Sequence, residues 1–357
     1  LQSTGIPNPA ITWYESKTFD VGVDAEAWNG LLGVTVDFFN RDRSGLLWTR
    51  DLSLPGVVGA DLPQENLNSD RTQGFDLEIN HRNRLGQFSY FAKAIFSYAR
   101  TQIRYFERAR AGNSYLNWYN NGDNGYLNNR WAGVYWGYGD GGRFTSFEDI
   151  YNVKIAQDRN WLPGDYIMED WNGDGQISEL DIHPIGYSGR PLIQYGITLG
   201  GSFKGFDLNL LLQGAAKANV AYFEQLNTPL WGSNRSSALE QFMDNWHPAD
   251  PTADPYDPNT VWVSGRFPYT GTVPPTNSKV NMQNAAYIRL KTVELGYTIP
   301  STILSRIGVK GVRIYANGYN LLTITKLKYV DPEHPSDTYG YLYPLNKSVS
   351  AGINVNF

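Results

Sequence analysis

The chain has 357 residues, including 24 Tyr, 16 Phe and 11 Trp, and only 18% of its residues are charged, a composition that favours β-strands joined by elaborate loops over long helices. Its net charge of −5 without a basic run excludes the usual nucleic-acid-binding surfaces, and the absence of cysteine excludes disulfide scaffolds, thiolate catalysis and cysteine-ligated zinc. No stretch approaches the roughly 18 apolar residues of a membrane-spanning helix, and no signal-peptide pattern opens the sequence.

An alternating pattern predicts a hairpin near the start of the chain. In residues 19–27, apolar side chains alternate with Asp, Gly and Glu, which gives one apolar and one carboxylate-rich face. Asn29 and Gly30 follow as a preferred two-residue hairpin turn, and a second alternating run begins at Leu32. We therefore expect two antiparallel strands that are joined tightly at this point.

The same alternation returns along the chain and predicts about nine strands. The further runs are 75–80 and 88–98 around a short turn at 82–86, 193–203 and 206–213 around Lys204-Gly205, 286–298 and 312–319, and 348–357. In the run 286–298 the apolar residues change parity, so we expect a β-bulge near Lys291 and Thr292.

The connections between these runs alternate between short turns and long segments, and the long ones are 41–71, 101–190, 214–284 and 321–346. Outer-membrane β-barrels combine short periplasmic turns, long extracellular loops and strands of about 9–11 residues that are apolar outside and polar inside. A soluble sandwich or propeller also alternates, but such long connections at one end argue against it. An odd number of strands suggests that further strands lie on another polypeptide or on an N-terminal portion outside this sequence.

Several stretches resemble the SusC-like TonB-dependent transporters of Bacteroidetes. They are NPAITWYESKTFDVGVD at 8–24, DLEIN at 76–80, PGDYIMEDWNGDGQISELD at 163–181, the block 285–333 that ends in DPE, and GINVNF with the terminal aromatic Phe357. The resemblance implies that residues 1–357 are the C-terminal portion of an all-β, antiparallel transmembrane barrel of about 22 strands, located in the bacterial outer membrane and in contact with its lipid. It also implies that the plug, the earlier strands and the TonB-contacting segment lie outside this chain, and that a SusD-like lipoprotein covers the barrel.

The segment 101–190, expected to be a long extracellular loop, contains an EF-hand-like motif. Oxygen-bearing side chains or carbonyls fall at positions 1, 3, 5, 7 and 12 of the motif, with Gly175 at the sharp turn. The expected calcium ligands are Asp170, Asn172, Asp174, Gln176 and Asp181. Asp181 stands where a bidentate Glu is usual, and the alternative is a turn rich in Asn, Asp and Gly that binds no ion. A bound ion would order the loop and have no catalytic role.

The same segment is rich in aromatic residues among Asn and Gly. Ring faces with amide neighbours suit sugar rings, and peptides could use the same surface. The candidate substrate-binding residues are Trp118, Tyr119, Trp131, Tyr135 and Trp136. The alternative is that these rings pack the loop itself or lie in the aromatic girdle at the membrane interface.

No catalytic motif is present, because the four histidines have no HExxH or paired spacing and there is no GxSxG or phosphate-binding loop. We therefore expect no enzyme activity and no catalytic residues. The expected function is import of oligosaccharides across the outer membrane as part of a TonB-dependent transporter. The alternatives are an oligopeptide importer of the same family, a passive porin, and a secreted glycan-binding β protein.

Overall fold

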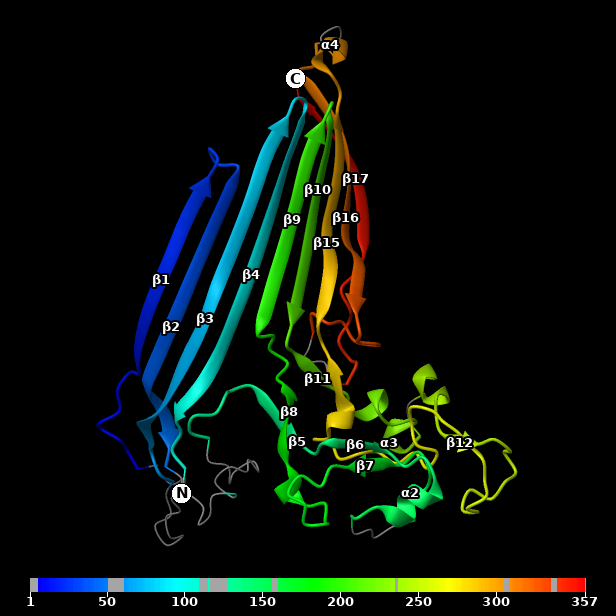
Figure 1. Ribbon diagram of the computed structural model, residues 1–357. Helices are drawn as coiled ribbons and strands as arrows, with labels where there is room; N and C mark the ends of the chain where they lie inside the picture. Colours follow the sequence, from blue (N-terminus) through cyan, green and yellow to red (C-terminus); the bar gives the residue numbers. More distant parts are fainter. Residues whose placement is uncertain are drawn as a thin grey trace, which may run out of the picture.

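The computed structural model describes residues 6–50, 61–108, 115, 127–155, 160–234, 237–304, 308–334 and 339–356. One nine-stranded antiparallel sheet dominates it, in the order β1-β2-β3-β4-β9-β10-β15-β16-β17 (Figure 1). Its strands are β1 (Glu15–Ala27), β2 (Leu32–Thr49), β3 (Gln64–Leu85), β4 (Phe88–Tyr105), β9 (Ile193–Phe203), β10 (Phe206–Ala216), β15 (Tyr287–Thr298), β16 (Gly311–Thr325) and β17 (Ser348–Asn356). The prediction of about nine antiparallel strands is confirmed.

The register gives the sheet an apolar face and a polar face, as the alternation predicts. Val23 pairs with Val36, and the next rung pairs Asp24 with Thr35 on the opposite face. The apolar face runs across all nine strands, and its side chains remain exposed. They include Phe19, Val21, Val23, Phe38, Ile79, Leu199, Leu208, Leu295, Ile314, Leu322, Ile324, Val349, Ile353 and Val355.

At one end of the sheet, the short-turn end, the strands are joined tightly (Figure 1). Lys204 and Gly205 join β9 to β10, both with positive φ, as a two-residue turn between twisted strands requires. The first hairpin differs from its prediction: Ala27 pairs with Leu32, so the loop spans residues 28–31 and is longer than a two-residue turn. In the second hairpin β3 continues to Leu85, which leaves only Gly86 and Gln87 as the turn.

The prediction of a long connection at 41–71 is wrong, because β2 and β3 stay paired as far as Thr49 and Gln64. The first four added rungs, residues 41–44 against 69–72, are polar on both faces and therefore carry no apolar alternation. Ion pairs across the strands hold them: Arg71 Nε lies 2.6 Å from Asp42 Oδ1, and Arg43 Nε lies 2.8 Å from Asp70 Oδ1. The charged residues that stabilise these rungs also interrupt the apolar alternation by which a strand is recognised in the sequence.

The predicted bulge in β15 is confirmed. Leu290 and Thr292 keep their partners on β16, whereas Lys291 between them has none, and the register with β10 shifts at the same level. The extra residue changes the parity of the apolar side chains along the strand.

At the other end of the sheet, the long-connection end, the connections fold into small elements of their own (Figure 1). These are β5 (Val134–Gly137), β6 (Asp140–Arg143), α2 (Phe147–Asn152), β7 (Tyr166–Met168), η2 (Glu179–Asp181), β8 (His183–Tyr187), β11 (Asn219–Ala221), η3 (Glu224–Leu226), α3 (Trp231–Asn234), η4 (Glu240–Met243), β12 (His247–Pro248), β13 (Trp262–Val263), η5 (Lys279–Asn281) and β14 (Met282–Asn284). The link between β15 and β16 at the short-turn end contains α4 (Ser301–Leu304). In the described part of the chain, no helix is both long and apolar enough to cross a membrane.

Most of the buried apolar core lies in these connections. Val220, Tyr222, Leu226 and Ala285 form one cluster with Leu327, which follows the last rung of β16. Phe144 and Leu162 are buried in the connection between β4 and β9. The long connections therefore pack as a layer with its own interior.

Candidate functional site

A polar concavity lies on the polar face, close to the long-connection end. It is a hollow of about 720 Å³, called here the polar-face hollow. Its polar wall residues come from five strands and from the connection after β16, and they are Thr35, Asp37, Asp76, Glu78, Ser97, Gln194, Gln213 and Glu333. An oligomeric polar solute could be contacted from several strands at once in such a hollow.

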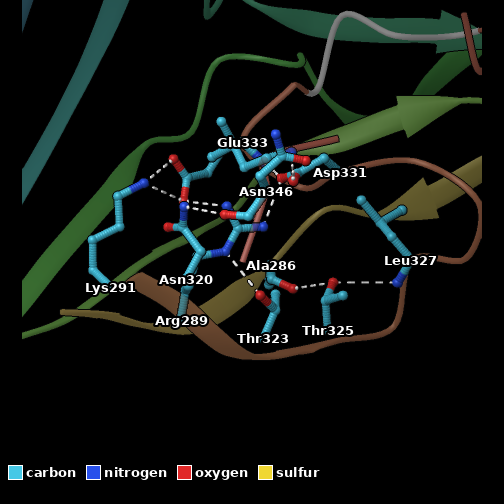
Figure 2. A network of polar contacts seen from close by, with 11 residues as sticks. Ala286, Arg289, Lys291, Asn320, Thr323, Thr325, Leu327, Asp331, Glu333 and Asn346 are labelled. Carbon is cyan, nitrogen blue, oxygen red and sulfur yellow. Dashed lines mark hydrogen bonds and ion pairs between the residues drawn. The ribbon is translucent and has the colours of Figure 1, made fainter. Parts of the chain in front are cut away.

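A network of charges, shown in Figure 2, shares Glu333 with the wall of the polar-face hollow. The guanidinium of Arg289 on β15 donates to Asp331 and to Glu333, each at 2.7 Å, and to Thr323 Oγ1 at 2.8 Å. The ammonium group of Lys291, at the bulge, lies 2.8 Å from Glu333. Because the side chains of Arg289 and Asp331 are each only 4% exposed, this is a buried ion pair.

The network fixes the described parts of the last connection, residues 326–334 and 339–347, against the sheet. Asp331 also accepts hydrogen bonds from the N–H groups of Glu333 and Leu345, which lie on both sides of the connection. Burial alone would raise the pKa of the Asp331 carboxyl, but these two hydrogen bonds and Arg289 outweigh burial and hold the pKa below its ordinary value. Asp331 is therefore a carboxylate at neutral pH and can join the two halves of the connection.

The residues of this network are absent from the site predicted from the sequence. The DPE that contains Asp331 and Glu333 was visible as part of the family resemblance, but nothing in the sequence paired it with Arg289. The bulge was visible too, and its extra residue Lys291 is the one that reaches Glu333. The pairing of Arg289 with Asp331 depends on how the connection after β16 folds back onto β15, and a local sequence pattern does not predict this.

The EF-hand-like segment forms a compact loop. Asp170 accepts hydrogen bonds from the backbone N–H groups of residues 173, 174 and 175 at 2.8–3.2 Å, and Gly175 has φ +81 as expected for the sharp turn. Asp174 accepts from the N–H of Gln176 and from the side chain of Asn172. The oxygen atoms of the first half are therefore turned into the loop.

Asp181 closes the loop from its far end. It is fully buried, and it accepts from the N–H groups of Trp171 and Asn172 and, at 2.7 Å, of Ser178. The donor types and the backbone fold thus agree with a hard-cation loop. Within the described ranges, however, no three acidic or histidine side chains converge closely enough to form a metal site. A cation would have to draw Asp181 and the first half of the loop together.

Three of the candidate substrate-binding aromatics lie in the described part of the chain. Trp131 is bridged to Gln102 of β4, and the guanidinium of Arg100 lies 4.2 Å from the centre of its ring. Trp136 and Tyr135 lie on β5, and Arg130 lies 4.7 Å from the Trp136 ring. Trp118 and Tyr119 lie outside the described residues. The structure thus places Trp131 and Trp136 against cations, and their role in substrate binding stays a prediction.

Comparisons with known proteins agree with this architecture. The chain is 25% identical to the TonB-dependent receptor P26 of Formosa agariphila over 100% of its own length, and 25% identical to the TonB-dependent receptor P3 of the same organism over 99%. It spans only 36% and 35% of those receptors. No family model matches the chain.

Among solved structures, the sheet and its connections superpose on the RagAB peptide transporter. The TM-score is 0.69, with 22% identity, covering 99% of this chain and 36% of that one. The same importer in an open-open state gives a TM-score of 0.69 with 23% identity, again over 99% of this chain and 36% of the other. The nine strands therefore have the fold of the wall of a larger transmembrane β-barrel.

Proposed function

We propose that this chain forms part of the barrel wall and extracellular loops of an outer-membrane importer. The chain is a relative of the TonB-dependent receptors and is similar to the C-terminal part of a SusC-like transporter. The sheet carries this proposal. Its apolar face stays exposed across all nine strands, which suits acyl chains, while the opposite face is polar and hollowed. The long-connection end is the extracellular end, and the short-turn end is periplasmic.

The proposed cargo is an oligosaccharide. Exposed rings lie in the last connection beside polar partners: Tyr339 and Tyr341 are stacked with centroids 5.7 Å apart, and Tyr343 is 77% exposed. The side chain of Gln225 donates to the Tyr339 carbonyl, and Tyr341 donates to Glu224. Stacked rings beside carboxylate and amide groups suit the apolar faces and hydroxyls of sugars. An oligopeptide is the second candidate, because the RagAB structures are described as those of a peptide importer.

Uptake by cells tests this proposal. Cells lacking the full-length gene should stop taking up a labelled oligosaccharide mixture, and a copy carrying Tyr341→Ala and Tyr343→Ala should restore uptake only in part. Tyr256→Ala serves as the matched control, because Tyr256 is also an exposed ring of a long connection, at 55%. Loss of peptide uptake with intact sugar uptake would favour the second candidate. Uptake that continues without the proton-motive force would contradict TonB dependence and favour a porin.

The proposed partners are those of a TonB-dependent system: a plug and further barrel strands in the whole protein, TonB, and a SusD-like lipoprotein above the extracellular end. We propose no enzyme activity, in keeping with relatives that are named as receptors and importers. Affinity purification of the full-length protein from its own outer membrane should recover a lipoprotein in stoichiometric amount. If no lipoprotein is recovered, the proposed SusD-like lid is wrong, while the proposed role of this chain in a barrel wall is unaffected.

Calcium binding at residues 170–181 is a separate proposal, in which Asp170, Asn172, Asp174 and Asp181 supply side-chain oxygens and Gln176 its carbonyl. The ion would order the extracellular connection. Native mass spectrometry of the full-length protein should detect one bound calcium that is lost with EDTA and in Asp170→Asn/Asp174→Asn. Asp250→Asn, which alters another turn-forming carboxylate, should retain the ion. Equal mass with and without EDTA would favour the ion-free turn.

A further inference from the structure

Three cationic side chains lie against aromatic rings at the long-connection end of β4 and β10. Arg100 and Arg130 lie over the rings of Trp131 and Trp136, at 4.2 and 4.7 Å. The ammonium group of Lys217 lies 5.8 Å from the centre of the Tyr98 ring and 5.9 Å from that of Tyr187. We call these seven residues the cation–aromatic cluster. A ring face beneath a cation stabilises the charge and fixes its position.

The register places the cation–aromatic cluster directly beyond the apolar face. Tyr98 pairs with Ile193, and Ile193 pairs with Ala216, so these three residues form one rung. Side chains alternate along a strand, so Arg100 lies on the same face as Tyr98, one step further toward the long-connection end. Lys217 follows Ala216 directly. Arg100 and Lys217 therefore lie next to the last apolar rung, at the long-connection end of the apolar face.

The aromatic part of the cluster is held on that face by backbone pairing. The segment around Trp131 continues the sheet beside β4: the N–H of Ile103 donates to the Arg130 carbonyl, and the N–H of Ala132 donates to that of Thr101, both at 2.8 Å. Gln102 and Trp131 form a bridge between them, so the indole shares the face of Arg100 and Gln102.

Five residues of the cluster, together with Asn128 and Asn129, line an open hollow of about 740 Å³; the five are Arg100, Arg130, Trp131, Trp136 and Tyr187. In the described residues, neither Arg100 nor Lys217 forms an ion pair with an acidic side chain. Arg100 Nε is moreover buried without a hydrogen-bond partner there. Arg100 and Lys217, which lie beside rings and form no ion pair with a carboxylate in the described residues, suit a hydrated anion that carries several acceptor oxygens.

We propose that the cation–aromatic cluster binds the phosphate-bearing headgroup of a lipid of the outer leaflet. The apolar face suits the acyl chains, and the layer that meets the cluster one step further along β4 is the headgroup region, where amphipathic rings are also enriched. Basic side chains at that depth attract anionic headgroups. The inference rests on the proposed orientation of the chain in the outer membrane and is independent of the imported substrate.

The test uses the full-length protein in detergent and monophosphorylated lipid A as the probe, with the same lipid after phosphatase treatment for comparison. Binding is measured by native mass spectrometry. Arg100→Gln/Lys217→Gln should weaken binding of the phosphorylated lipid about 30-fold, the loss expected from two headgroup-contacting cations. Arg84→Gln/Lys310→Gln removes the same charge at the short-turn end and should leave binding within about twofold. Heat-modifiable gel mobility reports whether each variant is folded.

Arg100→Lys/Lys217→Arg keeps both charges and should bind within about threefold of the parent, so the inference can be judged even if the neutral variant does not fold. Equal binding of the phosphorylated and dephosphorylated lipids, or an equal loss in both neutral double variants, would overturn the inference. Unchanged lipid binding together with a lost lipoprotein or a lost second copy would mean that the cluster is a protein interface. If the parent protein is missing from outer-membrane fractions, the proposed function itself fails.

Discussion

In the nine-stranded sheet few side chains of either face are buried, whereas the connections at the long-connection end bury a conventional apolar core. Of the buried apolar side chains in the described residues, only Ala215 and Tyr287 belong to the nine long strands. Val220 and Phe144, both in the connections, are fully buried. The sheet thus has almost no interior of its own.

This difference shows where each region obtains its stability. The connections can gain free energy in water by removing apolar area from solvent, at about 25 cal/mol per Å². The sheet has its backbone hydrogen bonds, but its apolar side chains stay exposed in the described residues, and its edge strands β1 and β17 each have one partner among the described strands. The Arg289 network joins the two regions, because it ties the last connection to β15.

The largest expected effect comes from a substitution that removes the contact between Arg289 and Asp331. Arg289→Met leaves the buried Asp331 without its guanidinium and should destabilise the attachment of the last connection by about 3–5 kcal/mol. Hydrogen exchange of the full-length protein should then show loss of protection at residues 326–334 and 339–346, with β15 unchanged at its centre.

Arg50→Met is the matched control for this prediction. Arg50, which directly follows β2, also pairs with a carboxylate, that of Glu65 on β3, but its side chain is 40% exposed, so its loss should leave the exchange of the last connection unchanged. If both variants behave alike, the network does not join the sheet to the connection.

A smaller effect is expected inside the connections. Leu226→Ala empties a site that is 3% exposed and should cost the connection layer about 2–5 kcal/mol, because the removed methyl groups leave a cavity. Leu230→Ala, at a site that is 48% exposed in the same connection, should have little effect. Limited proteolysis of the full-length protein should cut the first variant earlier within 217–286 while its barrel stays heat-modifiable. Simultaneous loss of the barrel would mean that sheet and connections unfold as one unit.

The sheet was predictable because apolar and polar residues alternate with period 2 in the central part of each strand. Even the bulge at Lys291 could be found, since the parity of the apolar residues changes there. The prediction of the strand ends failed where β2 and β3 extend beyond their apolar residues. Asp42 and Arg71 alternate there with other polar residues, so neither face is apolar, although ion pairs hold the two strands together.

The candidate site was less predictable, because its contacts are between distant segments. The motif at Asp170 was visible as a local pattern, and its turn forms as expected, whereas calcium binding stays a prediction. The link from Arg289 to Asp331 and the contact of Arg100 with Trp131 depend on where the connections return to the sheet. Composition suggested sugar-binding rings at Trp131 and Trp136, but it did not indicate the guanidinium groups that lie over them.

Two neighbouring residues of β10 can sharpen the comparison between the faces. Leu208 lies on the apolar face opposite Leu295, and Asn209 lies on the polar face opposite Glu294. Leu208→Arg should destabilise the barrel by about 2–4 kcal/mol if its face meets the middle of the bilayer. Asn209→Arg should be tolerated, and folding into lipid vesicles against urea measures both. Equal tolerance would mean that no lipid covers the apolar face.

The smallest expected effect is a dependence on acid. Because the folded pKa of Asp331 lies below its ordinary value, its carboxylate contributes stability above about pH 4, and that contribution is lost as the pH falls through the lower folded pKa. Protection of the last connection against exchange should therefore weaken in that acidic window while β10 keeps its protection. Asp331→Asn cannot titrate, so the part of the pH dependence that it removes belongs to this carboxyl. The same acid profile in the variant and the parent would assign the effect to other carboxylates and leave the Arg289 contact as an attachment that does not respond to pH.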